Sequence, residues 1–218
     1  KGRLPLHRAA AAISHLERQQ GDDDDEDPLD RSIVIQLIRS FPQAASYRDN
    51  SGCLPLHYIA MNSAVWGEEA TAVYQAHRNA MQVRAGDQHS HRLPLHMAAT
   101  SEKSRESLIQ SLLQHHPRAA SMTDGMGKLP FHLVCEAGKE WDDGARAIYE
   151  QYTAAIRTPE ENPRAWLPLH MAAASESSSA ELLNKLIEAN EAAQVEEARK
   201  RATESRERLS LGHLVSSG

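Results

Sequence analysis

The chain has 218 residues, of which 40% are hydrophobic and 25% are charged, and its formal net charge at pH 7 is −6. This is the composition of an ordinary soluble protein with enough apolar residues for a core. The absence of a basic stripe argues against a nucleic-acid-binding protein, and the absence of a run of 18 apolar residues argues against a membrane-spanning segment. Two cysteines, Cys53 and Cys135, are too few for a disulfide framework, so we expect no bridge between them and an intracellular, reducing compartment.

One tetrapeptide recurs along the chain. Leu-Pro-Leu-His starts at residues 4, 54, 93 and 167, and Leu-Pro-Phe-His starts at residue 129, so successive starts are 50, 39, 36 and 38 residues apart. Residues 41–57 and 116–132 also agree, without a gap, at nine of 17 positions. A repeat of this length predicts an array of stacked units rather than one central core.

The first unit contains an insertion. Its second helix is predicted by Ile33, Val34, Leu37 and Ile38, whose i, i+1, i+4, i+5 spacing marks one helix face. The six acidic residues 22–27 precede this helix. They lack the glycine and the glutamate that a calcium-binding EF-hand loop needs at its sixth and twelfth positions. We expect a solvated loop there, and docking of a basic partner is the alternative.

The later units follow two alternating forms. In the second and fourth units, Trp66 and Trp141 follow the tetrapeptide histidine by nine residues, and Tyr74 and Tyr149 follow it by 17. Each aromatic pair is expected to fill the space where the helices carry alanine in place of leucine. The third and fifth units instead carry an apolar helix face that begins 12 residues after the histidine: Leu108, Ile109, Leu112 and Leu113, and Leu182, Leu183, Leu186 and Ile187.

The fourth unit illustrates the elements expected within one repeat. Residues 121–128 contain an aspartate, two glycines and no apolar run, which indicates a turn. A short helix is predicted to begin at Pro130, because proline is favoured at the first helical position, and to end near Gly138. A second helix is predicted over residues 142–156, with acidic residues at its N-terminal end.

The last part of the chain is highly charged. After about Ala193 the apolar stripe fades, and pairs at i, i+4 spacing such as Glu197 and Arg201 favour a helix. We therefore divide the chain into a repeat array, residues 1–195, and a charged helical extension, residues 196–218. The extension is expected to be solvated, with partner docking as the alternative. The stretch RLSLGHLV (208–215) is a candidate degenerate start of a sixth repeat.

The stretches RDNSGCLPLHYIA, HSHRLPLHMAA and TDGMGKLPFHLVC resemble the ankyrin repeat, whose signature is a turn with Asp and Gly, then Thr-Pro-Leu-His-x-Ala, then a longer second helix. The resemblance covers residues 2 to about 195 and looks like the divergent form of algal ankyrin proteins. It implies an all-α, ankyrin-like solenoid of five helix-turn-helix repeats. Leucine replaces the family's threonine in every copy, and the periods exceed the usual 33 residues. We expect the family's hairpin fingers to be reduced to loops where glycine is missing, as in residues 159–166.

The tetrapeptide histidine is the third residue of each predicted helix. From there its side chain can accept a hydrogen bond from the backbone N–H of the preceding leucine, as glutamate does in a capping box, because leucine offers no acceptor. Its other ring nitrogen can donate to a carbonyl of the adjoining loop. The alternative is a metal ion shared between units, but packed helices lie about 8–10 Å apart whereas zinc binds nitrogen at about 2.1 Å. The sequence therefore favours an architectural role.

Other histidines invite a chemical interpretation. His115 and His116 are adjacent, and His89 and His91 flank a serine, but no cysteine or His-x3-His spacing accompanies them. We expect these histidines to lie in loops and at helix ends. The chain has no Gly-x-Ser-x-Gly, P-loop or His-Glu-x-x-His motif. We therefore predict no enzyme, no cofactor and no metal site.

The leading functional prediction is a scaffold that binds a partner protein, because stacked helix pairs form an extended concave surface. The family resemblance implies the same function, with contacts from the turn tips and from the exposed face of each first helix. The alternative is a subunit bound permanently in a large intracellular assembly. The chain starts at Lys1, directly before a repeat copy, so we expect a trimmed chain, and the sequence identifies neither organelle nor partner. The predicted contact residues, which break the core pattern and include adaptable methionines and aromatics, are Arg48, Asn50, Tyr58, Arg92, Met97, Met122, Met126, Lys128, Arg164, Trp166 and Met171.

Overall fold

The computed structural model describes the backbone of residues 3–16 and 32–215 and the side chains of residues 3–13 and 32–204. Within these ranges the chain forms ten α-helices and no β-strand, which confirms the predicted all-α class. The helices are α1 (Pro5–Leu16), α3 (Ile33–Ser40), α4 (Pro55–Asn62), α5 (Glu68–Ala76), α6 (Pro94–Thr100), α7 (Glu106–His115), α8 (Pro130–Glu136), α9 (Ala145–Gln151), α10 (Pro168–Ala174) and α11 (Ala180–Val215). The shorter 3-10 helices are η1 (Pro42–Ser46), η2 (Arg78–Gln82), η3 (Asp87–His89), η4 (Pro117–Ser121), η5 (Trp141–Asp143) and η6 (Thr153–Arg157).

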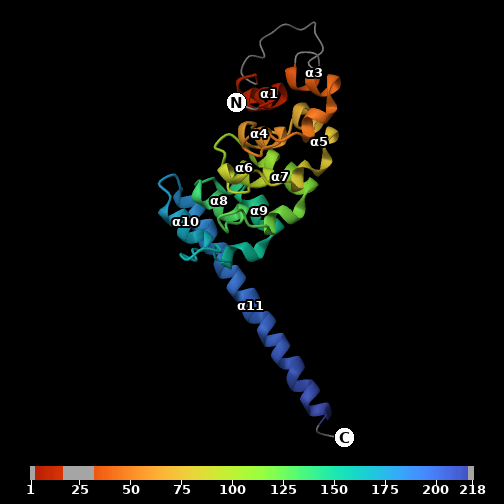
Figure 1. Ribbon diagram of the computed structural model, residues 1–218. Helices are drawn as coiled ribbons and strands as arrows, with labels where there is room; N and C mark the ends of the chain where they lie inside the picture. Colours follow the sequence, from red (N-terminus) through yellow and green to blue (C-terminus); the bar gives the residue numbers. More distant parts are fainter. Residues whose placement is uncertain (1–2, 17–31, 216–218) are drawn as a thin grey trace.

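The helices form a stack of pairs. The first helices of the units, α1, α4, α6, α8 and α10, pack on one another in chain order and form one column (Figure 1). The second helices, α3, α5, α7 and α9, form a parallel column, and α11 projects away from the end of the stack (Figure 1). The closely packed helix pairs join elements of the same or of adjacent units, as expected for a linear array.

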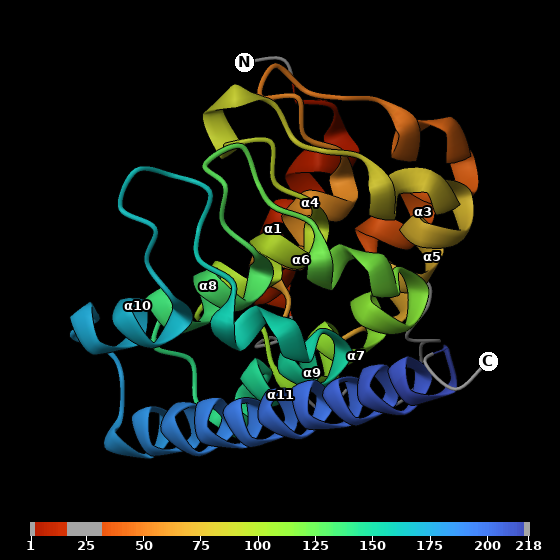
Figure 2. The same ribbon diagram turned by 90° about the horizontal axis from the view of Figure 1, so that it is seen from below.

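The turns before α4, α6, α8 and α10 protrude side by side from one face of the stack (Figure 2). Backbone hydrogen bonds join successive turns, for example from Gly125 N–H to the Ser90 carbonyl at 2.6 Å and from Glu161 N–H to the Gly127 carbonyl at 2.8 Å. A Cβ atom at Gly125 would lie only 2.9 Å from the Ser90 oxygen, so glycine permits this close approach. The turns carry no strand in the part of the chain that the structure describes.

The leucine of each tetrapeptide lies at the start of the first helix of its unit. It occupies the N-cap position with extended backbone, for example ψ 160° at Leu54, and proline follows at the first helical position. Leu54, Leu93 and Leu129 are at most 2% exposed. Leucine at this position therefore supplies core contact where threonine would supply a capping oxygen.

The second helix of the fourth unit is shorter than the sequence suggested. The predicted helix over 142–156 is wrong as one element, because α9 ends at Gln151 and Tyr152 adopts φ −145° and ψ 79° before the 3-10 helix η6. The second helices α3, α5 and α7 end in the same backbone conformation, at Phe41, His77 and His116 respectively. Where proline follows, as after Phe41 and His116, the break has a steric cause, because the residue before proline is disfavoured in the helical region.

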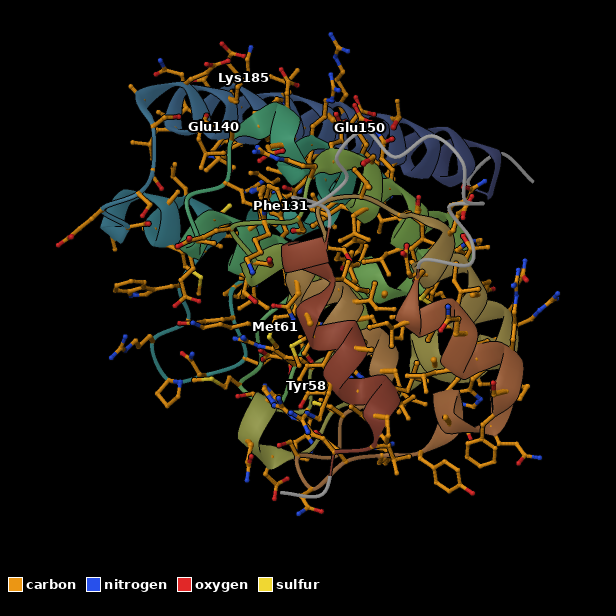
Figure 3. The ribbon with its side chains drawn as sticks, turned by 90° about the horizontal axis from the view of Figure 1, so that it is seen from above. Tyr58, Met61, Phe131, Glu140, Glu150 and Lys185 are labelled. Atoms are coloured by element: carbon orange, nitrogen blue, oxygen red, sulfur yellow. The ribbon has the colours of Figure 1, made fainter. Side chains whose placement is uncertain are left out.

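The apolar faces predicted for the second helices are mostly buried. Leu108, Ile109, Leu112 and Leu113 are at most 5% exposed, which confirms this face of α7. In the first unit Ile33 departs from this pattern, because its side chain is 52% exposed. The largest fully buried side chain is that of Phe131, in the interior of the stack (Figure 3).

The two rings of each aromatic pair pack together within their own unit. The rings of Trp66 and Tyr74 are 5.9 Å apart and those of Trp141 and Tyr149 are 5.6 Å apart, and all four side chains are half-buried against the core. His115, at the end of α7, stacks on Tyr74 with ring centroids 4.4 Å apart. The expected space-filling role of the aromatic pairs agrees with these contacts.

Both cysteines are buried as free thiols, which agrees with the expected absence of a bridge. No helix among the described residues combines the length and the apolar character needed to cross a membrane.

The last helix differs from the other second helices because it does not break. Asn190 aligns with His116, but Glu191 stands where Pro117 follows His116, and α11 continues to Val215. Residues 208–215 therefore continue α11 and do not open a separate sixth first helix. The acidic residues 22–27 lie outside the described residues.

Candidate partner-binding groove

The tetrapeptide histidines form a ladder that links neighbouring units. Because Nδ1 accepts a hydrogen bond from the leucine N–H, the ring proton lies on Nε2, which donates to a carbonyl in the next turn. This confirms the predicted architectural geometry for the second, third and fourth units, whereas in the first unit His7 Nδ1 has no hydrogen-bond partner among the described residues. In the second unit, Leu54 N–H donates to His57 Nδ1 at 3.0 Å, and His57 Nε2 donates to the Val83 carbonyl at 3.0 Å. In the third unit the same two bonds join Leu93 to His96 (3.3 Å) and His96 to Met122 (3.0 Å). In the fourth unit they join Leu129 to His132 (3.0 Å) and His132 to Thr158 (2.9 Å).

Burial keeps these histidines neutral. Loss of solvation lowers the pKa of His57 and of His96 from the ordinary value of 6.5 to about 4, and burial also lowers the pKa of His132. A neutral imidazole has one donor and one acceptor, and the ladder uses both. Within the part of the chain that the structure describes, no group of three or more His, Cys, Asp or Glu side chains could hold a metal ion.

The ladder is incomplete at the last unit. His170 Nδ1 accepts from Leu167 N–H at 3.1 Å, but the side chain is exposed and its Nε2 has no acceptor among the described residues. In the second, third and fourth units the acceptor lies 26 residues further on. Here that residue is Glu196, whose carbonyl belongs to α11. The fifth unit is therefore polar and open where the others are closed by a neighbour.

A carboxylate organises the turn before α8. Asp124 Oδ1 accepts hydrogen bonds from the N–H groups of Met126 (2.8 Å) and Lys128 (3.0 Å), and Oδ2 accepts from Arg92 Nε of the preceding unit at 3.1 Å. Asp49 has the same arrangement before α4, where Tyr58 Oη donates to Oδ2 at 2.6 Å. An acidic residue in each of these turns thus receives both main-chain and side-chain donors.

Several predicted contact residues have structural roles instead. Tyr58, Met97 and Met171 are 3%, 1% and 4% exposed, so their prediction as exposed contact residues is wrong (Tyr58 is labelled in Figure 3). Tyr58 lies against the preceding first helix, because its ring contacts that of His7 on α1 with centroids 6.1 Å apart. Arg92 ties its turn to Asp124, and Arg48 donates to the carbonyls of Gly52 and Arg84. Asn50 is exposed and Met122 is half-buried, and neither lies in the groove described next.

Five of the predicted residues meet in one place, a groove of about 500 Å³ beside α8 and α10. Two come from the turn before α8, two from the turn before α10, and Met171 comes from α10 itself. The lining residues are Met126, Lys128, Glu136, Glu160, Asn162, Arg164, Trp166, Met171, Ala174 and Ser175.

The groove combines apolar surface with ordered charges. Met126 is 52% exposed, and the guanidinium of Arg164 lies over the Trp166 ring, 5.6 Å from its centroid. Lys128 Nζ pairs with Glu136 Oε1 at 2.7 Å. An apolar surface with a few fixed polar groups is the usual character of a binding site.

Glu160 is the groove residue that the sequence interpretation missed. It is 3% exposed, and its Oε2 is buried without a hydrogen-bond partner among the described residues. The signal was present, because Glu160 aligns with Asp124 once the turn before α10 is recognised as two residues longer. Its N–H donates to the Trp166 carbonyl, as that of Asp124 donates to Lys128.

The repeat pattern indicates which residue would be expected to pair with Glu160. Lys128 precedes its tetrapeptide as Arg92 does, and Arg92 binds the acid of the following turn. Lys128 Nζ instead donates a hydrogen bond to Glu136, a residue of its own unit. The groove therefore contains a buried carboxylate that the repeat pattern would pair with a cation.

No protein-family model matches this chain, and no curated protein matches it either.

Proposed function

We propose that the chain is a protein-interaction module, built as a divergent ankyrin-like solenoid, which binds a segment of a partner protein in the groove beside α8 and α10. The stacked helix pairs, the ladder of histidines and the row of hydrogen-bonded turns support the ankyrin-like interpretation. The convergence of Met126, Lys128, Arg164 and Trp166 on one groove carries the proposal, because these residues come from two separate turns.

The groove suits a polypeptide segment. Trp166 and Met126 offer flat and adaptable apolar surface, and interfaces are enriched in aromatic, methionine and arginine side chains. Arg164, Lys128 and Glu136 line the same groove and can fix the direction of a bound chain by hydrogen bonds. A groove of this composition binds through a few central contacts, and Trp166 is the expected centre.

A peptide selection tests the proposal. Random 12-residue peptides displayed on phage are selected on the whole chain, and the enriched peptides are then measured against two variants. Trp166→Ala removes the central groove contact, whereas Tyr47→Ala removes an aromatic side chain that is 49% exposed and lies outside the groove. We expect a loss of about 2 kcal/mol or more for Trp166→Ala and none for Tyr47→Ala. Selected peptides that bind Trp166→Ala as well as the wild type contradict the proposal.

A permanently bound subunit is a second candidate, and the end of the stack supports it. Ile187 and Val195 on α11 are 44% and 52% exposed, and Leu183 next to them is half-buried. In the third unit, Ile109 and Leu113, which correspond to Leu183 and Ile187, are 0% and 5% exposed. Size-exclusion chromatography separates the two candidates, because a scaffold is expected to remain monomeric and an obligate subunit is expected to aggregate when isolated.

A further inference from the structure

We propose that the groove beside α8 and α10 recognises a lysine or arginine side chain of its partner, and that Glu160 is the residue that binds the cationic group. The inference rests on the proposed function, because it names the chemistry of the segment that the groove would bind. It depends on three observations: the burial of Glu160, the pairing of Lys128 with Glu136, and the apolar walls beside the carboxylate.

The first step concerns the carboxylate itself. An ionised carboxylate is rarely buried without a paired charge or a full set of donors, because the loss of hydration is large. Asp49 and Asp124 obey this rule through Arg3 and Tyr58 in one turn and Arg92 in the other. Glu160 Oε2 departs from it, which indicates a donor that is supplied from outside the described residues.

The second step concerns competition within the groove. Among the described residues that line the groove, Lys128 is the only lysine, and its Nζ lies 2.7 Å from Glu136 Oε1. Arg164 lies over Trp166. Both cations of the groove are therefore engaged with other groups, and the carboxylate of Glu160 is left for a third cation.

The third step concerns access. Glu160 lines the groove even though its Oε2 lies beneath the surface. The last torsion of a glutamate side chain is broad and roughly two-fold, so a small rotation turns an oxygen toward the groove. The aliphatic stem of a lysine or an arginine would then lie along Met126 and Trp166 while its head reaches Glu160, as long basic side chains do at apolar surfaces.

The test uses the peptides selected on the whole chain. We expect a lysine or arginine at one constant position in the peptides whose binding needs Trp166. Replacing that residue by glutamine in a synthetic peptide, or changing Glu160→Gln in the chain, should each weaken binding about 10- to 100-fold, as the loss of a charge-assisted hydrogen bond does. The two changes together should weaken binding no further, because they remove the same contact.

A second variant separates recognition by Glu160 from general attraction to acidic residues. Glu161→Gln removes the same charge as Glu160→Gln from the neighbouring residue, which is exposed and does not line the groove, and it retains Glu160. We expect this variant to bind the basic peptide as well as the wild type. Equal losses in Glu161→Gln and in Glu160→Gln overturn the inference.

The outcomes also distinguish this inference from the proposed function. Peptides that need Trp166 but carry no constant basic residue and bind Glu160→Gln normally overturn the inference and leave the interaction module intact. Peptides that bind without Trp166 overturn the interaction groove itself. Circular dichroism of every variant before the binding experiment excludes loss of fold as the cause.

Discussion

The third and fifth units carry the same tetrapeptide, but the structure uses it differently in each. His96 is fully buried and bonds both its own helix start and the next turn, whereas His170 is exposed and bonds only its own helix start. The acidic residues of the turns that follow the third and the fourth unit differ in the same way. Asp124 receives three donors, and Glu160 keeps an unpaired oxygen.

This difference shows that the neighbour decides what a repeated residue contributes. A histidine between two units stabilises their interface, and the same histidine at an open end is free for other contacts. Polar groups that are satisfied inside a stack contribute stability. At the end of the stack they remain as candidates for binding, and the proposed groove lies at that end.

Acidification should produce the largest difference between the inner units and the last unit. The pKa values of His57 and His96 are lowered by burial to about 4, so between about pH 6.5 and pH 4 the unfolded chain binds more protons than the folded chain. The contribution of these two histidines to the free energy of unfolding is therefore fully present above about pH 6.5, and it is lost as the pH decreases toward 4. A fall in pKa from 6.5 to about 4 corresponds to about 3 kcal/mol for each histidine. Urea unfolding at several pH values measures this slope.

A matched variant assigns the slope to the ladder. His96→Gln removes one buried titrating group, so its unfolding free energy should depend less steeply on pH than that of the wild type. An identical pH dependence for His96→Gln and the wild type would show that His96 does not control acid unfolding.

Truncation of the histidines should have the next largest effect. His96→Ala leaves the Leu93 N–H and the Met122 carbonyl without their partner, and we expect a loss of about 1–3 kcal/mol of unfolding free energy. His170→Ala removes one bond at an exposed site and should cost less than about 1 kcal/mol. Thermal unfolding with and without a chelator provides the measurement. A chelator that by itself reproduces the loss would assign the histidines to metal binding.

Neutralising the two turn carboxylates should have different effects on the stability of the fold. Asp124→Asn weakens the bond from Arg92 and the bonds from two backbone N–H groups, so it should destabilise the fold by about 1–3 kcal/mol. Glu160→Gln removes a buried charge that has no recorded partner at Oε2, so it should leave stability unchanged or raise it by up to about 1 kcal/mol.

Chemical denaturation of the two carboxylate variants gives the comparison. Glu136→Gln serves as the control for a partly exposed ion pair, which contributes about 0–1 kcal/mol. A loss of stability for Glu160→Gln that equals the loss for Asp124→Asn would mean that a side chain of this protein already satisfies Glu160 in solution.

The sequence predicted the helical units and the role of the histidines because both depend on local spacing. Proline at the first helical position and histidine at the third determine the bond from Leu93 N–H to His96 without knowledge of the rest of the chain. The bond from His96 Nε2 to Met122, 26 residues further on, could be predicted only as a contact with the adjoining loop.

The sequence was less informative where packing between units decides the outcome. Tyr58, Met97 and Met171 were assigned to an exposed face, but their side chains are buried in the packing of the column. Glu160 was missed because the turn before α10 is two residues longer than the turn before α8, which hides its alignment with Asp124. Both errors concern contacts between units, which the spacing within a single repeat does not determine.

The second helices give the last comparison, between a helix that breaks and one that continues. After α7, His116 adopts φ −144° and ψ 74° and Pro117 follows, whereas α11 passes through Asn190 and Glu191 without a break. Ala192 and Ala193, which follow Glu191, favour the helical state. Because residue 191 is not proline, the backbone of Asn190 is not disfavoured in the helical region.

Changing Glu191→Pro should impose on α11 the break that ends α7. An internal proline removes one backbone hydrogen bond and costs about 3 kcal/mol of local helix stability, so the segment after residue 190 should lose helix content in far-UV circular dichroism. The free energy of unfolding of the stack should change by less than about 1 kcal/mol, because the ion pair of Glu197 with Arg157 is partly exposed and contributes little. Glu191→Ala is the control and should retain the helix. A loss of stack stability as large as that of His96→Ala would instead show that the extension belongs to the folded core.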